Sequence, residues 1–124
     1  MVHLPGTSVH LIADLDGCCR LDDAVHVEQV LRMAASAAKA HVVGVHLHHF
    51  GEAMGLTAVA MLAESHISIH TWPETGVAAV DLFVCGENAD AAAGLAVIAS
   101  MLGGRIARQH SLQRLGTDKP CHLP

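Results

Sequence analysis

A chain of 124 residues has the length of one ordinary domain, with room for a single core. Apolar residues make up 52% of the chain and aromatic residues only 2%, so the core must be built from aliphatic side chains. The formal net charge of −5 and the seven scattered Lys and Arg residues exclude the basic stripe that a nucleic-acid-binding protein needs, and no apolar stretch reaches the roughly 18 residues that would span a membrane.

The first half of the chain predicts a strand, a helix and a second strand. Residues 8–14 alternate in the manner of a strand with one buried face. Asp22 or Asp23 can cap a helix that runs to about Lys39, within which apolar residues recur every three or four positions. The second strand covers residues 42–50.

The second half predicts mainly strands. Three strand-like runs cover residues 57–63, 67–71 and 78–84. Asn88 can then cap a second helix that ends near Leu102. A short strand is expected at residues 105–109, followed by a loose polar tail from Leu112.

Together these elements predict an α+β fold in one domain, residues 1–124. We expect a two-layer sandwich in which two helices lie on one face of a largely antiparallel sheet. The N-terminus shows no secretory signal, and the adjacent residues Cys18 and Cys19 are a poor disulfide framework. We therefore expect a cytoplasmic protein with reduced thiols.

The residues suited to chemistry gather in one region. Residues 64–74 read Glu-Ser-His-Ile-Ser-Ile-His-Thr-Trp-Pro-Glu, and residues 78–86 read Ala-Ala-Val-Asp-Leu-Phe-Val-Cys-Gly. Hydroxyl, imidazole, carboxylate and thiol groups are those from which nucleophilic and proton-transfer sites are built. The pattern alone favours an ordinary strand with polar side chains on its solvent face.

In residue order these two segments closely resemble the prokaryotic S-adenosylmethionine decarboxylases. The resemblance implies a proenzyme that cleaves itself between Glu64 and Ser65, giving chains 1–64 and 65–124. The Ser65 hydroxyl would attack the preceding carbonyl, and elimination would leave a pyruvoyl group at residue 65. This group would form a Schiff base with the substrate amine and accept the electrons left when carbon dioxide departs.

The resemblance implies roles for three further residues. His70 would take the Cα proton of the serine-derived residue, and Cys85 would return a proton to the substrate carbon. Thr57 stands where the family usually has a serine that assists cleavage. Side chains alternate along a strand, so Ser65 and His70 would face opposite ways unless the chain bends. The proposed pairing of the two therefore needs a bend or bulge at Ser65.

The resemblance also indicates the substrate-binding residues. Phe50 and Trp72 would offer aromatic surfaces for adenine, and Glu74 would contact the ribose hydroxyls. Thr75 and Val77 replace tyrosines that are common in the family, which leaves open an ornithine or arginine decarboxylase with the same pyruvoyl chemistry. A non-catalytic relative that binds a metabolite or a partner subunit is the third interpretation.

The remaining predictions concern metals and partners. His46 and His48 share a face of a predicted strand, but no further ligand completes a set, so we predict no metal site. His10 is interpreted as a surface or packing residue. The family's usual assembly implies a homodimer of cleaved protomers with active sites near the interface. A small-molecule substrate is expected, and neither a nucleic acid nor a membrane.

Overall fold

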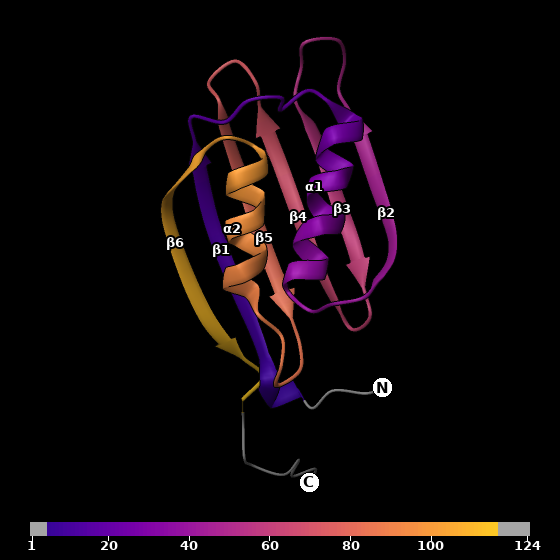
Figure 1. Ribbon diagram of the computed structural model, residues 1–124, viewed down its shortest axis with the longest axis vertical. Helices are drawn as coiled ribbons and strands as arrows, with labels where there is room; N and C mark the ends of the chain where they lie inside the picture. The colour runs from indigo at the N-terminus through magenta and orange to yellow at the C-terminus, as the bar shows by residue number, and fades with distance from the viewer. Residues whose placement is uncertain (1–4, 117–124) are drawn as a thin grey trace, which may run out of the picture.

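The structure, a computed structural model, describes residues 5–116. A short turn of 3-10 helix, η1 (Pro5–Thr7), leads into β1 (Ser8–Asp16), α1 (Ala24–Ala37) and β2 (Val42–His49). The chain continues through β3 (Leu56–Leu62), β4 (Ser65–Trp72), β5 (Val77–Val84), α2 (Ala91–Met101) and β6 (Arg105–Arg114), as Figure 1 shows. Within residues 5–116, neither helix is both long and apolar enough to cross a membrane.

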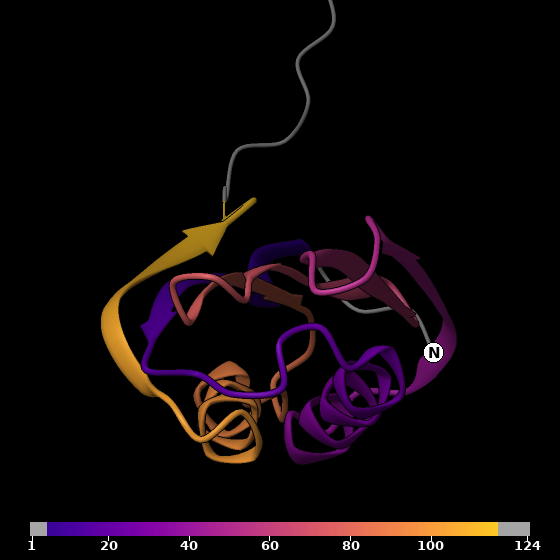
Figure 2. The ribbon, with the colours of Figure 1, turned by 90° about the horizontal axis from the view of Figure 1, so that it is seen from above.

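The strands form one six-stranded sheet in the order β2-β3-β4-β5-β1-β6. Each neighbouring pair is antiparallel. Both helices cover the same face (Figure 2), and no described element covers the other, which we call the open face. The predicted two-layer α+β architecture is therefore confirmed.

The helix layer packs closely on the sheet through aliphatic side chains and one glycine. The apolar stripe of α1 is fully buried at Val27, Val30 and Leu31. A Cβ atom at Gly94 of α2 would lie 2.8 Å from Leu82 Cδ2 and 3.1 Å from the Ala34 carbonyl oxygen. Gly94 therefore allows α2 to approach β5 and α1 together. Such close packing suits a core with few aromatic rings.

Several element boundaries differ from those predicted, most by one or two residues, and the differences at α2 and β6 have clear physical reasons. The cap of α2 is Asp90 rather than Asn88, because the Asp90 carboxylate accepts from the Ala93 amide at 3.0 Å. Strand β6 continues to Arg114, which pairs with Ser8, so residues 112–114 belong to a strand and not to a loose tail. Almost every side chain of β6 is exposed, so the strand carries no apolar alternation and its backbone pairing with β1 alone defines it.

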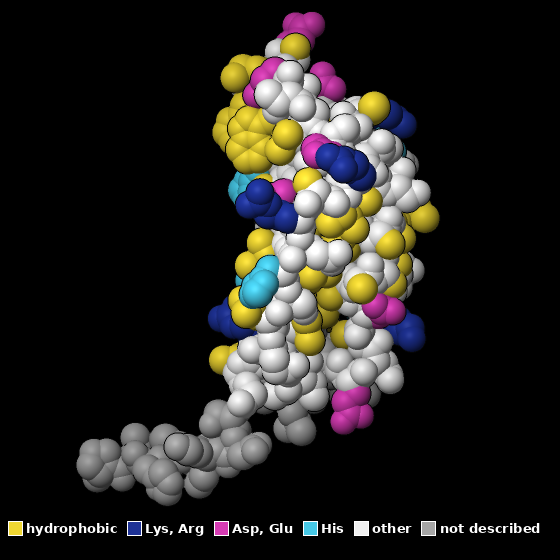
Figure 3. Space-filling view, turned by 90° about the vertical axis from the view of Figure 1, so that its left-hand side faces the viewer, with side chains coloured by type: hydrophobic (Ala, Val, Ile, Leu, Met, Phe, Trp, Pro, Cys, Tyr) yellow, Lys and Arg dark blue, Asp and Glu magenta, His cyan; other side chains and the backbone are white. Residues whose placement is uncertain are grey.

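Ion pairs line this edge of the sheet. Arg105 Nε lies 2.7 Å from Asp16 Oδ1, and Arg108 Nε lies 3.7 Å from Asp14 Oδ2. Figure 3 looks onto this side and shows basic and acidic side chains beside one another. Charged side chains on an edge strand disfavour pairing with a further strand.

Candidate active site

The predicted cleavage site lies in the tight turn between β3 and β4. Leu62 pairs with Ser65, so Ala63 and Glu64 are the two turn residues. Glu64 has a positive φ of 63°. A residue with positive φ at the second position of a two-residue turn is usually glycine or asparagine. For other residues this backbone conformation costs about 1–3 kcal/mol of strain. The backbone strain therefore falls on the residue that precedes the predicted scissile bond.

Strand register brings three strands together at this turn. The β4–β5 pairing, continued beyond His66 and Phe83, places Cys85 opposite Glu64. The Cys85 thiol donates to the Glu64 carbonyl oxygen at 3.1 Å. On the other side, the Ser8 hydroxyl oxygen lies 3.2 Å from Cys85 Sγ. We call Ser8, Glu64, Ser65 and Cys85 the cleavage corner.

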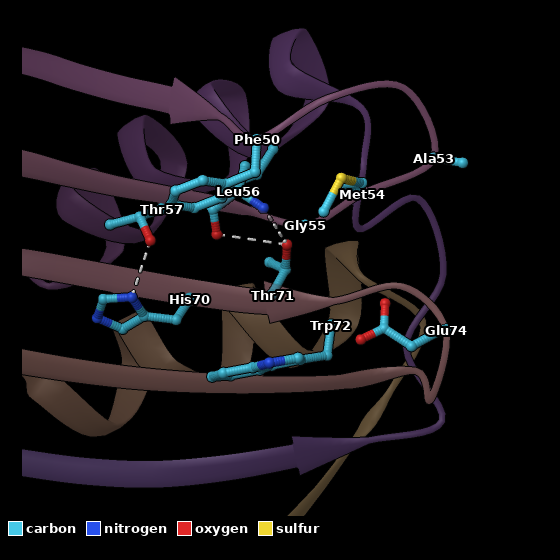
Figure 4. Close-up of a pocket in the computed structure, with 10 residues that line it drawn as sticks. All are labelled: Phe50, Ala53, Met54, Gly55, Leu56, Thr57, His70, Thr71, Trp72 and Glu74. Atoms are coloured by element: carbon cyan, nitrogen blue, oxygen red, sulfur yellow. Dashed lines mark hydrogen bonds between the residues drawn. The ribbon is translucent and has the colours of Figure 1, made fainter.

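The other predicted residues lie at the opposite end of β4, around a cavity of about 490 Å³. Its lining includes five of them, Phe50, Thr57, His70, Trp72 and Glu74. Figure 4 shows that they come from the end of β2, from β3 and β4, and from the turn after β4. Within the cavity, Thr57 Oγ1 and His70 Nδ1 are 3.0 Å apart in a hydrogen bond.

Buried contacts hold this end of the sheet in shape. The Thr71 hydroxyl donates to the Leu21 carbonyl oxygen at 2.7 Å and accepts from the Leu56 amide at 3.0 Å. A Cβ atom at Gly55 would collide with the Thr71 carbonyl oxygen, so only glycine lets the β2–β3 loop lie this close to β4. The cavity wall is therefore fixed by backbone contacts as well as by side chains.

The predicted bend at Ser65 is wrong. Strand β4 pairs with both β3 and β5 without a register shift. Ser65 and His70 are five residues apart on this regular strand, which corresponds to about 16 Å at roughly 3.3 Å per residue. One protomer therefore does not bring its own serine and histidine together. The irregular backbone lies at Glu64, in the turn itself.

Between the two ends, the open face carries a polar network that the sequence analysis did not identify. Arg114 Nη1 lies 2.9 Å from His10 Nδ1, and because a guanidinium only donates, this ring nitrogen accepts. The hydrogen of His10 is therefore on Nε2, which donates to Asp81 Oδ2 at 2.6 Å. His66 Nε2, at 2.9 Å, and the Ser68 hydroxyl bind the same carboxylate. His10 is thus neither a free surface residue nor a simple packing residue.

This network also has the spacing of a metal site. His10, His66 and Asp81 each offer one ligand atom, and these atoms lie within 4.8 Å of one another. A metal would need the lone pair of His10 Nε2, but the contact with Arg114 places a hydrogen there. We therefore interpret the group as a hydrogen-bond network rather than as a ligand set.

Comparison with known proteins places this geometry in a family. The sequence profile described as S-adenosylmethionine decarboxylase matches residues 9–115. The chain belongs to the S-adenosylmethionine decarboxylase family. The S-adenosylmethionine decarboxylase proenzyme of Parasynechococcus marenigrum is 41% identical over 113 residues, which cover 90% of this chain and 85% of that one. The proenzyme of Methanococcus vannielii is 52% identical over 81 residues, or 64% of this chain and 66% of its own length.

A solved structure of the same family supports the fold. The adenosylmethionine decarboxylase of Aquifex aeolicus superposes with a TM-score of 0.81 at 30% identity, covering 95% of this chain and 98% of that one. The resemblance noted in the sequence is thus confirmed at the level of the decarboxylase family. The roles of individual residues stay predictions.

In this decarboxylase, Asp81 should contribute to stability through its charge. Burial alone would raise the pKa of Asp81, but hydrogen bonds from Ser68, His10 and His66 together lower it. A lowered pKa in the folded state means that the stabilisation is complete above the unfolded pKa of about 3.9 and is lost as the pH falls towards the folded value. We expect Asp81→Asn to reduce the free energy of unfolding by about 2 kcal/mol at pH 7.

Urea denaturation between pH 7 and pH 3 measures this effect. The difference between wild type and Asp81→Asn should be constant near neutral pH and shrink below about pH 4. Asp14→Asn is the matched control. Among the described residues, Asp14 forms one ion pair, with Arg108 at 3.7 Å, and its side chain is half-exposed, so the change should alter stability by less than about 1 kcal/mol. A loss at Asp81 that does not vary with pH would contradict this interpretation.

Proposed function

We propose that this chain is the proenzyme of an S-adenosylmethionine decarboxylase that cuts itself between Glu64 and Ser65. The observation that carries the proposal is the contact of the Cys85 thiol with the Glu64 carbonyl oxygen, in the turn where the family resemblance predicts cleavage. A pyruvoyl group at residue 65 would supply the electron sink for decarboxylation. The geometry fits its formation, because the bond that must break follows a strained residue and its carbonyl is already polarised.

The cleavage corner supports the first step of this reaction. Attack of Ser65 Oγ on the Glu64 carbonyl carbon forms a C–O bond, breaks the C–N bond and leaves an ester. Negative charge develops on the Glu64 oxygen during the attack, and the Cys85 thiol donates to that atom at 3.1 Å. Release of the positive φ at Glu64 would lower the barrier further.

The cavity residues support the second step, which needs a base. When His70 Nδ1–H donates to Thr57 Oγ1, the lone pair of Nε2 is available to take a proton. In this arrangement Thr57 accepts from His70 and holds the ring in place, and its hydroxyl can fill the role of the serine usual in the family. Removal of the Ser65 Cα proton would then expel the Glu64 carboxylate.

The distance of about 16 Å between Ser65 and His70 favours a homodimer, because the base would then come from a second copy. The open face exposes large apolar side chains, among them Ile12, Met61, Trp72 and Leu112. A two-fold axis that lies between two open faces, perpendicular to the strands, would pack these faces against each other. The strands of one protomer would then run opposite to those of its partner. The cleavage corner of each protomer would then lie over the cavity of its partner.

The cavity favours S-adenosylmethionine over a basic amino acid. Phe50 and Trp72 offer exposed aromatic surface, which suits both adenine and the weakly hydrated sulfonium cation. Glu74 is the one carboxylate among the described residues that line the cavity, and it can pair with a ribose diol. The names of the relatives support the same substrate.

Release of labelled carbon dioxide tests the substrate. Processed enzyme should release it from carboxyl-labelled S-adenosylmethionine and not from labelled ornithine or arginine. Glu74→Gln should raise KM for S-adenosylmethionine about 10- to 100-fold, since it removes a charged partner of the ribose, and should leave self-cleavage unchanged. Turnover of ornithine or arginine alone would replace this substrate assignment but keep the pyruvoyl chemistry. Absence of turnover by fully cleaved protein would favour the non-catalytic interpretation.

A further inference from the structure

Ser8 lies beside the one thiol in the cleavage corner. It is the first residue of β1, and the β1–β5 register, continued past Val9 and Val84, places it opposite Cys85. The residue is only 1% exposed, and its Oγ lies 3.2 Å from Cys85 Sγ. The resemblance and the proposed reaction assign no role to this residue.

The direction of the hydrogen bond between Ser8 and Cys85 follows from the number of hydrogens. A thiol has one hydrogen, and that of Cys85 is directed at the Glu64 carbonyl oxygen. The sulfur can therefore only accept from the Ser8 hydroxyl, which must be the donor. The three groups form a relay in which Ser8 donates to Cys85 and Cys85 donates to the scissile carbonyl.

We propose that Ser8 is a positioning residue that acts through Cys85. Its hydroxyl fixes the rotation of the thiol, so that the S–H bond stays on the Glu64 carbonyl oxygen during cleavage. The same hydroxyl stabilises the thiolate that remains when Cys85 gives a proton to the substrate carbon, because hydrogen bonds to charged groups are the stronger ones. The inference rests on the proposed function, which gives Cys85 its two tasks.

The coupling between Ser8 and Cys85 can be measured without any catalysis. The uncleaved Ser65→Ala chain is treated with iodoacetamide over a range of pH, and alkylation is quantified for each cysteine by peptide mass spectrometry. Adding Ser8→Ala should shift the pH profile of Cys85 alkylation to higher pH, because the thiolate loses a hydrogen bond. Ser8→Thr should restore the original profile. Exposed Cys19 should show an unchanged profile, and buried Cys18 should stay protected if the variant is folded.

The effect on cleavage is tested by a double-mutant cycle. Ser8→Ala should slow self-cleavage about tenfold in the otherwise wild-type chain, as expected for the loss of one hydrogen bond to the reacting group. In the Cys85→Ala background, the same change should have no further effect. An unchanged Cys85 profile together with equal slowing in both backgrounds would overturn the role of Ser8. If Ser8→Ala alters the Cys85 profile in the Ser65→Ala chain but the wild-type chain never cleaves, the contact is upheld and the proposed function is refuted.

Discussion

Ser65→Ala should remain one chain of 124 residues, while the wild type separates into residues 1–64 and 65–124. Alanine has no hydroxyl to attack the Glu64 carbonyl carbon, so neither the ester nor the elimination that follows can form. The strain at Glu64 and the contact with Cys85 remain, but without a nucleophile they cannot break the bond. We therefore expect complete loss of cleavage rather than slower cleavage.

Intact mass under denaturing conditions is the measurement. The second wild-type fragment should be lighter than its serine-initiated sequence by one ammonia, which distinguishes self-processing from cleavage by a contaminating protease. Ser68→Ala is the matched control, because Ser68 lies on the same strand but donates to Asp81 and should leave cleavage in place. A wild-type chain that stays whole after long incubation would refute the proenzyme assignment.

Two inactive chains should restore cleavage in each other when they form a dimer. Neither His70→Ala nor Ser65→Ala should cleave alone, because one lacks the base and the other lacks the nucleophile. In a mixed dimer, the Ser65 of the first chain would meet the intact His70 of the second. The expected result is cleavage of the His70→Ala chain and none of the Ser65→Ala chain.

This experiment requires co-expression with two different affinity tags and isolation of the mixed species through both. A chain with both substitutions, paired with the wild type, is the control: the wild-type Ser65 would then face a partner without His70 and should stay uncleaved in that dimer. If His70→Ala stays intact in every mixture, the base acts within its own protomer. The straight path of β4 makes that result unexpected.

The layout of the fold and the family could be predicted from the sequence. The apolar stripe of the first helix and the alternation of the central strands report burial directly, because each residue's polarity reflects the face on which it lies. The predicted edge strand β6 is too short, because almost all of its side chains are exposed and their polarity does not report a buried face. Only backbone pairing with β1 defines its length. Asn88 and Asp90 are both suitable helix caps by residue type, so the sequence does not decide between them. The local backbone geometry makes Asp90 the cap of α2.

The arrangement of the candidate site was decided by the tertiary structure. The motif names Ser65, His70 and Cys85 within a short stretch, but spacing along the chain does not say which side chains meet. Strand register places Cys85 of β5 opposite Glu64, and Ser8 of β1 opposite Cys85, so that the three residues form one row across the sheet. His70 lies at the far end of β4. The sequence by itself therefore determined which groups are present. Pairing between strands distant in sequence determined which of them can act on the same bond within one protomer.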